Sequence, residues 1–173
     1  MKKTALFVCA LFYTFSLFAQ EMSSKKWLLE VNNDVWLPFI VSWATNDVEK
    51  YNGLHAKDLI RAGENEVQDF QSYAEHNRIN FKRRKDQSLK VIIDFRLLER
   101  ANNGEMGSER GIYETTYINE KGEEFKDYGK FHVFLRKVEG IWKIAVDYDS
   151  DENKTINEHS FKAAFALDDF SKF

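Results

Sequence analysis

The sequence predicts an α+β fold, with helices packed on one face of an antiparallel sheet. Two observations lead to this prediction. Apolar residues recur at every third or fourth position up to about residue 85, which is the spacing of helices with one buried face. From Leu89 onward they recur at every second position, which is the spacing of strands. Because three helical segments precede a series of long hairpins, the elements should form α+β layers.

The first predicted helix covers residues 24–46 and contains a proline. Its apolar stripe includes Trp27, Trp36 and Trp43, which is the spacing of a core face. Pro38 interrupts the stripe, and proline both lacks a backbone donor and crowds the carbonyl four residues earlier. We expect a long helix that is kinked at Pro38, and the alternative is a new helix capped by Asp34.

Two shorter helices should follow. Asn46 and Glu49 resemble a capping box at the start of a helix that reaches His55. A short strand is expected over residues 58–62, and Asn65 is expected to cap a third helix that ends in the basic run 82–85. This run could receive an anionic ligand, although a solvated helix end is the default interpretation.

Four long strands are expected over residues 89–98, 112–118, 125–138 and 141–149. In the last of these, plain alternation places Trp142, Ile144, Val146 and Tyr148 on the inner face. It places Asp147 on the outer face, where the carboxylate would form cross-strand ion pairs. A β-bulge would reverse the alternation and turn Asp147 into the interior.

The first nineteen residues have the pattern of a secretory signal peptide. A basic start precedes an uncharged apolar run from Ala5 to Phe18, and Ala19 supplies the small residue of a cleavage site. Lipid attachment at Cys9, the alternative, would need a small residue where Val8 stands. We therefore predict a signal peptide (1–19), one domain (20–150) and a helical tail packed on it (151–173), in a protein that is periplasmic or secreted.

Composition and motifs argue against several classes of partner and cofactor. The net charge is −3, and it becomes more negative if Lys2 and Lys3 are removed, which argues against a nucleic-acid partner. No later apolar run is long enough to span a membrane. The four histidines lack the spacing of metal ligands, and no phosphate-binding loop or nucleophile motif is present. We expect neither a metal nor a cofactor.

Several strings carry a resemblance to a known family, among them Trp36–Ile40, Asn46–Glu49 and Gly140–Asp147. They resemble bacterial members of the nuclear transport factor 2-like superfamily, the SnoaL-like proteins and a related domain of unknown function, over residues 24–150. The resemblance implies a cone, in which a strongly curved sheet encloses a pocket that is open at one end. Members often dimerise through the sheet. Some are isomerases, dehydratases or cyclases, so the fold does not fix the function.

Polar residues near the expected pocket form the candidate site. The catalytic candidates are His55, Asp58 and Asp147, each of which could act as a general base. The expected ligand pocket is lined by Trp36, Tyr51, His55, Arg61 and Tyr113. The alternative interpretation is structural: His55 and Tyr51 would be core residues, and Asp58 and Arg61 would lie at exposed strand ends.

Three functions remain open at this point. The leading one is a protein that binds a small, mostly apolar molecule in the cone. The second is a cofactor-independent isomerase, dehydratase or cyclase that works by proton transfer. The third is a structural or dimerisation module with a vestigial pocket. The outer sheet face, with Phe134 at its middle, is predicted either to pair in a homodimer or to be covered by the tail.

Overall fold

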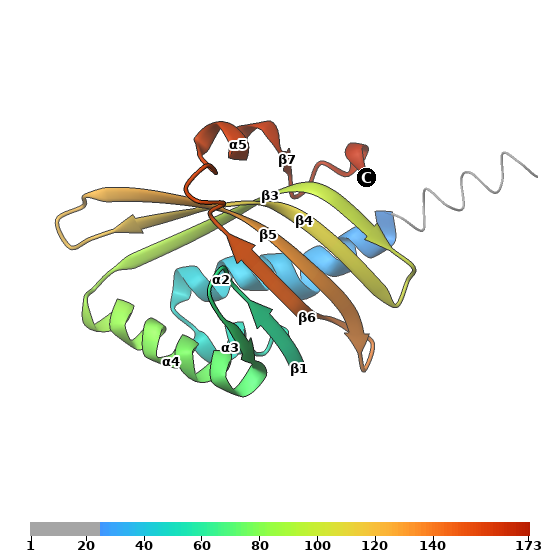
Figure 1. Ribbon diagram of the computed structural model, residues 1–173, viewed down its shortest axis with the longest axis horizontal. Helices are drawn as coiled ribbons and strands as arrows, with labels where there is room; N and C mark the ends of the chain where they lie inside the picture. Colours follow the sequence, from blue (N-terminus) through green and yellow to red (C-terminus); the bar gives the residue numbers. More distant parts are fainter. Residues whose placement is uncertain (1–24) are drawn as a thin grey trace, which may run out of the picture.

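The computed structural model describes residues 25–173 as a curved sheet with helices on its concave side (Figure 1). The predicted α+β fold is confirmed. The predicted signal peptide and Cys9 lie outside the described residues. Within residues 25–173, no helix combines the length and the apolar character that a membrane crossing requires.

The N-terminal helix is continuous through the proline. Residues 25–31 are α-helical, Asn32–Trp36 (η1) form a wider π turn, and Leu37–Thr45 (α2) complete the helix. The Leu37 N–H donates to the Asn32 carbonyl, five residues back, and this wider turn accommodates the ring of Pro38. Asp34 does not cap a new helix. Its carboxylate instead accepts a hydrogen bond from the Trp142 backbone N–H, at 3.1 Å.

The next two helices begin later than the sequence predicts. Val48–Asn52 (α3) is capped by Asp47, because Asn46 has a left-handed backbone (φ 56°) that ends α2. Phe70–Asp86 (α4) is capped by Asp69, whose carboxylate accepts a hydrogen bond from the Ser72 N–H at 2.8 Å. The residues around the expected cap instead form a turn region and a short strand.

Seven strands form one sheet in the order β2-β1-β6-β5-β4-β3-β7. Their bounds are His55–Ala62 (β1), Val67–Asp69 (β2), Lys90–Asn102 (β3), Met106–Ile118 (β4), Glu124–Val138 (β5), Ile141–Ser150 (β6) and Phe165–Ala166 (β7). All neighbours are antiparallel except β1 and β6, which are parallel. The long strands β3 to β6 curve over α2 and α4 (Figure 1).

Two irregularities in the sheet decide which residues face the interior. Phe134 pairs with Val146 and Leu135 pairs with Ile144, so Ala145 is an extra residue in β6. This bulge turns Asp147 inward, whereas Val146 and Tyr148 face outward. The prediction from plain alternation was therefore wrong for these three residues, and the bulged alternative is the one that the structure adopts.

A second bulge acts in the same way on β3. Leu97 pairs with Gly111 and Glu99 pairs with Arg110, which leaves Leu98 unpaired. The side chain of Arg100 is thereby turned into the core, where it meets Glu109 of β4. Because the sequence pattern contains no sign of either bulge, this buried ion pair was not predicted.

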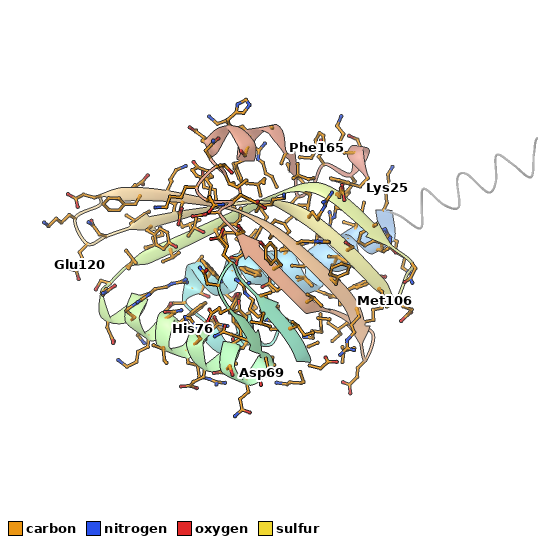
Figure 2. The ribbon with its side chains drawn as sticks, viewed as in Figure 1. Lys25, Asp69, His76, Met106, Glu120 and Phe165 are labelled. Atoms are coloured by element: carbon orange, nitrogen blue, oxygen red, sulfur yellow. The ribbon has the colours of Figure 1, made fainter. Side chains whose placement is uncertain are left out.

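Residues 151–173 fold back on the outer side of the sheet. Glu158–Ala163 form α5, β7 pairs with β3, and Phe170–Lys172 form a short 3-10 helix. Phe165 lies on the opposite side of the sheet from His76 of α4 (Figure 2). Phe161 is buried against Ile112, yet Phe134 remains 47% exposed. The tail therefore covers only part of the outer face.

Candidate functional site

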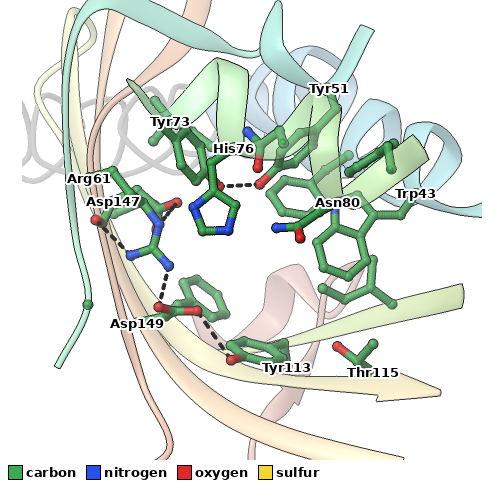
Figure 3. A pocket seen from close by; sticks show the side chains of 18 of the residues that line it. Trp43, Tyr51, Arg61, Tyr73, His76, Asn80, Tyr113, Thr115, Asp147 and Asp149 are labelled. Carbon is green, nitrogen blue, oxygen red and sulfur yellow. Dashed lines mark hydrogen bonds and ion pairs between the residues drawn. The ribbon is translucent and has the colours of Figure 1, made fainter. Parts of the chain in front are cut away.

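A cavity of about 260 Å³ lies between the concave face of the sheet and helix α4 (Figure 3). Its floor is aromatic. Trp36 of the N-terminal helix packs against Phe95 of β3 and Phe131 of β5, with ring centroids 4.8 and 5.1 Å apart. Phe39 closes the group against Phe95, at 4.9 Å. These rings give the pocket a rigid apolar surface without filling it.

Polar residues of β1, β4 and β6 form one wall of the pocket. Arg61 is directly opposite Asp147 in the sheet register, and its Nε lies 3.5 Å from Asp147 Oδ2. The same guanidinium forms a closer ion pair with Asp149 through Nη2. Asp149 Oδ2 also accepts a hydrogen bond of 3.2 Å from the Tyr113 hydroxyl. Gly129 makes room for Tyr113, because a Cβ there would overlap the ring.

The Asp147 carboxyl group has an altered acidity. Burial raises its pKa from 3.8 to about 6, since Arg61 only partly offsets the loss of hydration and Asp149 adds repulsion. The long contact with Arg61 fits this result, because the guanidinium is shared with the closer Asp149. Although burial opposes it, the pKa of Arg61 is raised by Asp147, Tyr73 and Asp149. Arg61 therefore stays charged, while Asp147 can exchange a proton near neutral pH.

Three tyrosines provide neutral hydroxyl groups at the polar side of the pocket. The hydroxyls of Tyr51 and Tyr73 are 2.5 Å apart. Burial raises the pKa of Tyr73 to about 12 and raises that of Tyr51 well above its ordinary value. Burial, and then the negative charge of Asp149, also raises the pKa of Tyr113. All three are protonated at pH 7. The Tyr113 O–H donates to Asp149 and one O–H of the Tyr51–Tyr73 pair donates to the other, which leaves one O–H of that pair free to donate.

His55 lies behind the pocket and does not line it, so its predicted place among the lining residues was wrong. Its ring packs edge-on against Tyr51 and Tyr73, with centroids 5.1 and 5.3 Å apart. His55 is 3% exposed, and burial lowers its pKa to about 4. It is neutral at pH 7 and supports the two tyrosines, which is the structural interpretation.

Asp58 belongs to the outer surface. It forms an ion pair with Arg136 of β5, and its side chain is 65% exposed. It therefore cannot act as a base in the pocket. The remaining predicted lining residues, Trp36, Tyr51, Arg61 and Tyr113, do line the cavity.

The pocket also contains residues that sequence reasoning missed. Asp149 and Tyr73 complete the polar wall, and Trp43, Asn80 and Arg84 line the cavity farther along α2 and α4. The sequence pattern placed Trp43 in a core stripe. No motif marks these side chains. The bulge in β6 turns Asp149 toward the pocket, and the approach of α4 to the sheet brings Tyr73, Asn80 and Arg84 there. Within residues 25–173, no three His, Cys, Asp or Glu side chains gather as a metal site would require.

A second buried arginine lies outside the pocket. Arg100 Nε is 2.8 Å from Glu109 Oε1, and both side chains are fully buried. Trp36 Nε1 donates to Glu109 Oε2 at 2.5 Å, and Arg100 Nη2 donates to Asn32 Oδ1 at 2.7 Å. The Leu167 carbonyl accepts from the Asn32 amide at 2.9 Å. This closed network joins the first helix, the sheet and the tail.

Comparison with known proteins identifies the architecture. No protein-family model and no curated protein matches the sequence. Solved structures do match it: Aln2 from a Streptomyces species has a TM-score of 0.63 at 10% identity, covering 72% of this chain and 89% of that one. An NTF-2-like protein of unknown function from Shewanella oneidensis MR-1 has a TM-score of 0.55 at 15% identity, covering 75% and 98%. This chain has the nuclear transport factor 2-like fold.

A further match of the same kind is a ketosteroid isomerase-like protein from Erwinia carotovora atroseptica. Its TM-score is 0.54 at 15% identity, and the match covers 71% of this chain and 94% of that one. Identities this low establish the nuclear transport factor 2-like fold alone. Function must therefore be argued from the pocket.

Proposed function

We propose that this nuclear transport factor 2-like protein binds a small, mostly apolar molecule in its cone pocket. The observation that supports this most strongly is an open cavity of about 260 Å³ in an otherwise packed core. An aromatic floor provides apolar contact area, while Arg61, Asp149 and Tyr113 provide a few fixed polar groups. This combination is typical of small-molecule sites. A vestigial pocket, as in a purely structural module, would be filled by aromatic side chains.

The test is native mass spectrometry of protein purified from its own cells. We expect a retained small molecule, visible as a defined mass increment. Thr115 is buried at the cavity wall, so Thr115→Phe should occupy the cavity and remove the increment. Thr116→Phe is the matched control, because the next residue on β4 faces the other side of the sheet. Equal retention by both variants would contradict binding in the pocket.

A second function is favoured by one specific observation, the raised pKa of Asp147. A carboxyl group that titrates near 6 at a cavity wall, beside neutral tyrosine donors, could serve as a general base in an isomerase, dehydratase or cyclase reaction. Arg61 and the free O–H of the Tyr51–Tyr73 pair would then stabilise developing negative charge. One structural neighbour carries a name of this kind, a ketosteroid isomerase-like protein.

Proton transfer can be tested without knowing the substrate. Deuterium uptake from D2O into a set of small cyclic ketones should be catalysed by the protein and should fall by about 10²–10⁴-fold in Asp147→Asn. The rate of uptake should fall less in Asp149→Asn, because Asp149 is already bonded to Arg61 and Tyr113. The absence of any uptake by the unaltered protein would leave binding as the function.

We further propose that the protein is exported. The basic start, the apolar run and Ala19 support removal of residues 1–19. The intact mass of protein from its own cells should correspond to a chain that begins at Gln20. A species that retains Met1, or one with lipid on Cys9, would contradict this proposal.

A further inference from the structure

One cation at the pocket has no anionic partner within the part of the chain that the structure describes. Arg84, near the end of α4, lines the cavity, and its guanidinium carbon lies 4.1 Å from the ring centroid of Trp43 and 4.8 Å from that of Phe81. Its Nη1 is buried without a hydrogen-bond acceptor among residues 25–173. Buried donors of this kind are normally satisfied, and because Arg84 lines the cavity, a ligand there could supply the acceptor.

The neighbours of Arg84 show that it is not simply the solvated end of a helix. Lys82 forms an ion pair with Asp86, and Arg83 and Lys85 are exposed at the last turn, where cations complement the helix dipole. Arg84 alone in this run of four is turned inward against aromatic rings. Burial lowers its pKa, yet an arginine remains charged at pH 7.

The two arginines of the pocket differ in how their charge is balanced. Arg61 already faces Asp147 and Asp149. Arg84 lies about three helical turns beyond Tyr73, which is close to Arg61, so the unpaired charge is at the other end of α4. Besides Asp147 and Asp149, two more carboxylates line the cavity, Glu66 and Asp127, and neither forms an ion pair with Arg84. Asp127 Oδ1 accepts the Tyr128 backbone N–H at 3.1 Å.

Other polar groups line the cavity along α4 between the Arg61 end and Arg84. His76 and Asn80 precede Arg84 at steps of four residues, so all three lie along one side of α4. All three line the cavity, and Figure 3 shows His76 and Asn80 pointing into it. The row continues the polar side of the pocket from the Arg61 end to Arg84, with the Asn80 amide one turn from the unpaired charge.

We propose that the pocket ligand carries a carboxylate, which binds the Arg84 guanidinium while the apolar part of the ligand lies on the aromatic floor. This inference rests on the proposed binding function. A planar guanidinium matches a carboxylate through two parallel hydrogen bonds. A single unpaired cation balances one negative charge, whereas a phosphate dianion would leave a buried charge unbalanced. The carboxylate thus fixes the ligand with its far end directed toward Asp147.

The test compares an acid with its uncharged isostere. 1-Naphthaleneacetate should bind at least about tenfold more tightly than 1-naphthaleneacetamide by titration calorimetry. Arg84→Gln should abolish this difference while keeping the affinity for the amide. Arg83→Gln is the matched control, because it removes an exposed charge next to Arg84 and should preserve the preference. Equal binding of acid and amide by the unaltered protein would overturn the proposal, as would equal losses in the two variants.

Binding of small anions, followed by NMR, provides a second measurement that does not depend on the shape of the naphthalene compounds. Acetate should shift the Arg84 Nε–H resonance in the unaltered protein, whereas acetamide should not. Inorganic phosphate should bind more weakly than acetate, and tighter binding of phosphate would overturn the choice of a carboxylate. If neither naphthalene compound binds but acetate still shifts Arg84, the apolar pocket proposal fails and the anion site stands. If the amide binds and acetate has no effect, the anion site fails and the pocket stands.

Discussion

Two arginines meet carboxylates inside this domain, and the two clusters differ in how completely they are bonded. Arg100 and Glu109 are fully buried at 2.8 Å, and Trp36 and Asn32 satisfy their remaining groups. Arg61 and Asp147 are 3.5 Å apart at the wall of an open cavity. The same pair of charges thus forms a closed structural network in one place and a partly satisfied, proton-exchanging group in the other.

The difference shows how a buried ion pair that can serve a ligand site is distinguished from one that only stabilises the core. One β-bulge turns Arg100 into the core, and the other turns Asp147, a partner of Arg61, inward. Both ion pairs are inside the domain for the same reason, so burial alone does not distinguish the structural pair from the functional one. What separates them is the presence of unfilled space beside the charges. A closed network leaves nothing for a ligand to bond, whereas a charge at a cavity wall retains unused bonding capacity.

The substitution with the largest expected effect removes Arg100 from the closed network. Arg100→Met should lower the free energy of unfolding by about 3–5 kcal/mol, because it leaves the Glu109 carboxylate buried without its partner. Arg61→Met should cost no more than about 2 kcal/mol, since Asp147 can take up a proton and Asp149 is partly exposed and keeps its hydrogen bond from Tyr113. Urea denaturation measures both. As a control, Lys130→Met removes an exposed pair with Glu152 and should cost less than about 1 kcal/mol. Equal costs for the two core arginines would contradict the comparison.

A smaller effect concerns pH. The pKa of Asp147 is raised from 3.8 to about 6 in the folded protein, so the folded state binds more protons between these values. The contribution of Asp147 to stability is fully present below about pH 4 and is lost as the pH rises through about 6. The stability of the unaltered protein relative to Asp147→Asn should therefore fall by about 2–3 kcal/mol from pH 4 to pH 7.

Denaturation of both proteins across this pH range provides the measurement. The variant serves as the reference because His55, whose pKa is lowered to about 4, titrates equally in both proteins. A relative stability that does not change with pH would mean that Asp147 is an ordinary carboxylate.

The smallest expected effect on stability concerns the outer face, which lies on the other side of the sheet from both arginine clusters. Ile60, Val146 and Phe134 are directly opposite one another on β1, β6 and β5, and the tail leaves them uncovered. We propose that a second copy of the chain covers this row. Phe134→Glu should convert a dimer to a monomer in light scattering. At a concentration low enough for both proteins to be monomeric, it should change stability by less than about 0.5 kcal/mol.

Phe125→Glu is the control for this surface, because Phe125 is 61% exposed at the end of a hairpin, away from the row. It should leave the dimer intact. A monomer at all concentrations in the unaltered protein would contradict pairing through this face.

The alternation of apolar residues was enough to predict the fold and the inward faces of Trp142 and Ile144, both of which are fully buried. It was not enough for Asp147 or Arg100, because a bulge adds one residue without any change in composition. Caps were misplaced by one to four residues, since several Asn and Asp residues compete at each helix start.

Only part of the candidate site could be predicted, because alternation assigns a residue to a face of an element but does not reveal its neighbours. Residues on long elements, such as Trp36 and Tyr113, were assigned to the pocket through the expected cone. The basic run 82–85 was considered as a site for an anionic ligand, but the pattern could not show that Arg84 alone turns inward. Asp149 was missed because the β6 bulge reverses the alternation. His55 was misplaced, since a polar residue at a helix end can point either into a cavity or behind it.

The comparison between the two clusters is tested most directly by following both carboxyl groups by ¹³C NMR while the pocket is filled. In the free protein, Asp147 should titrate near pH 6. Addition of 1-naphthaleneacetamide, which is uncharged, should shift the Asp147 resonance and its pKa while leaving the Glu109 resonance unchanged. An Asp147 carboxyl group that titrates near its ordinary value of 3.8, or that moves no more than Glu109, would contradict the account.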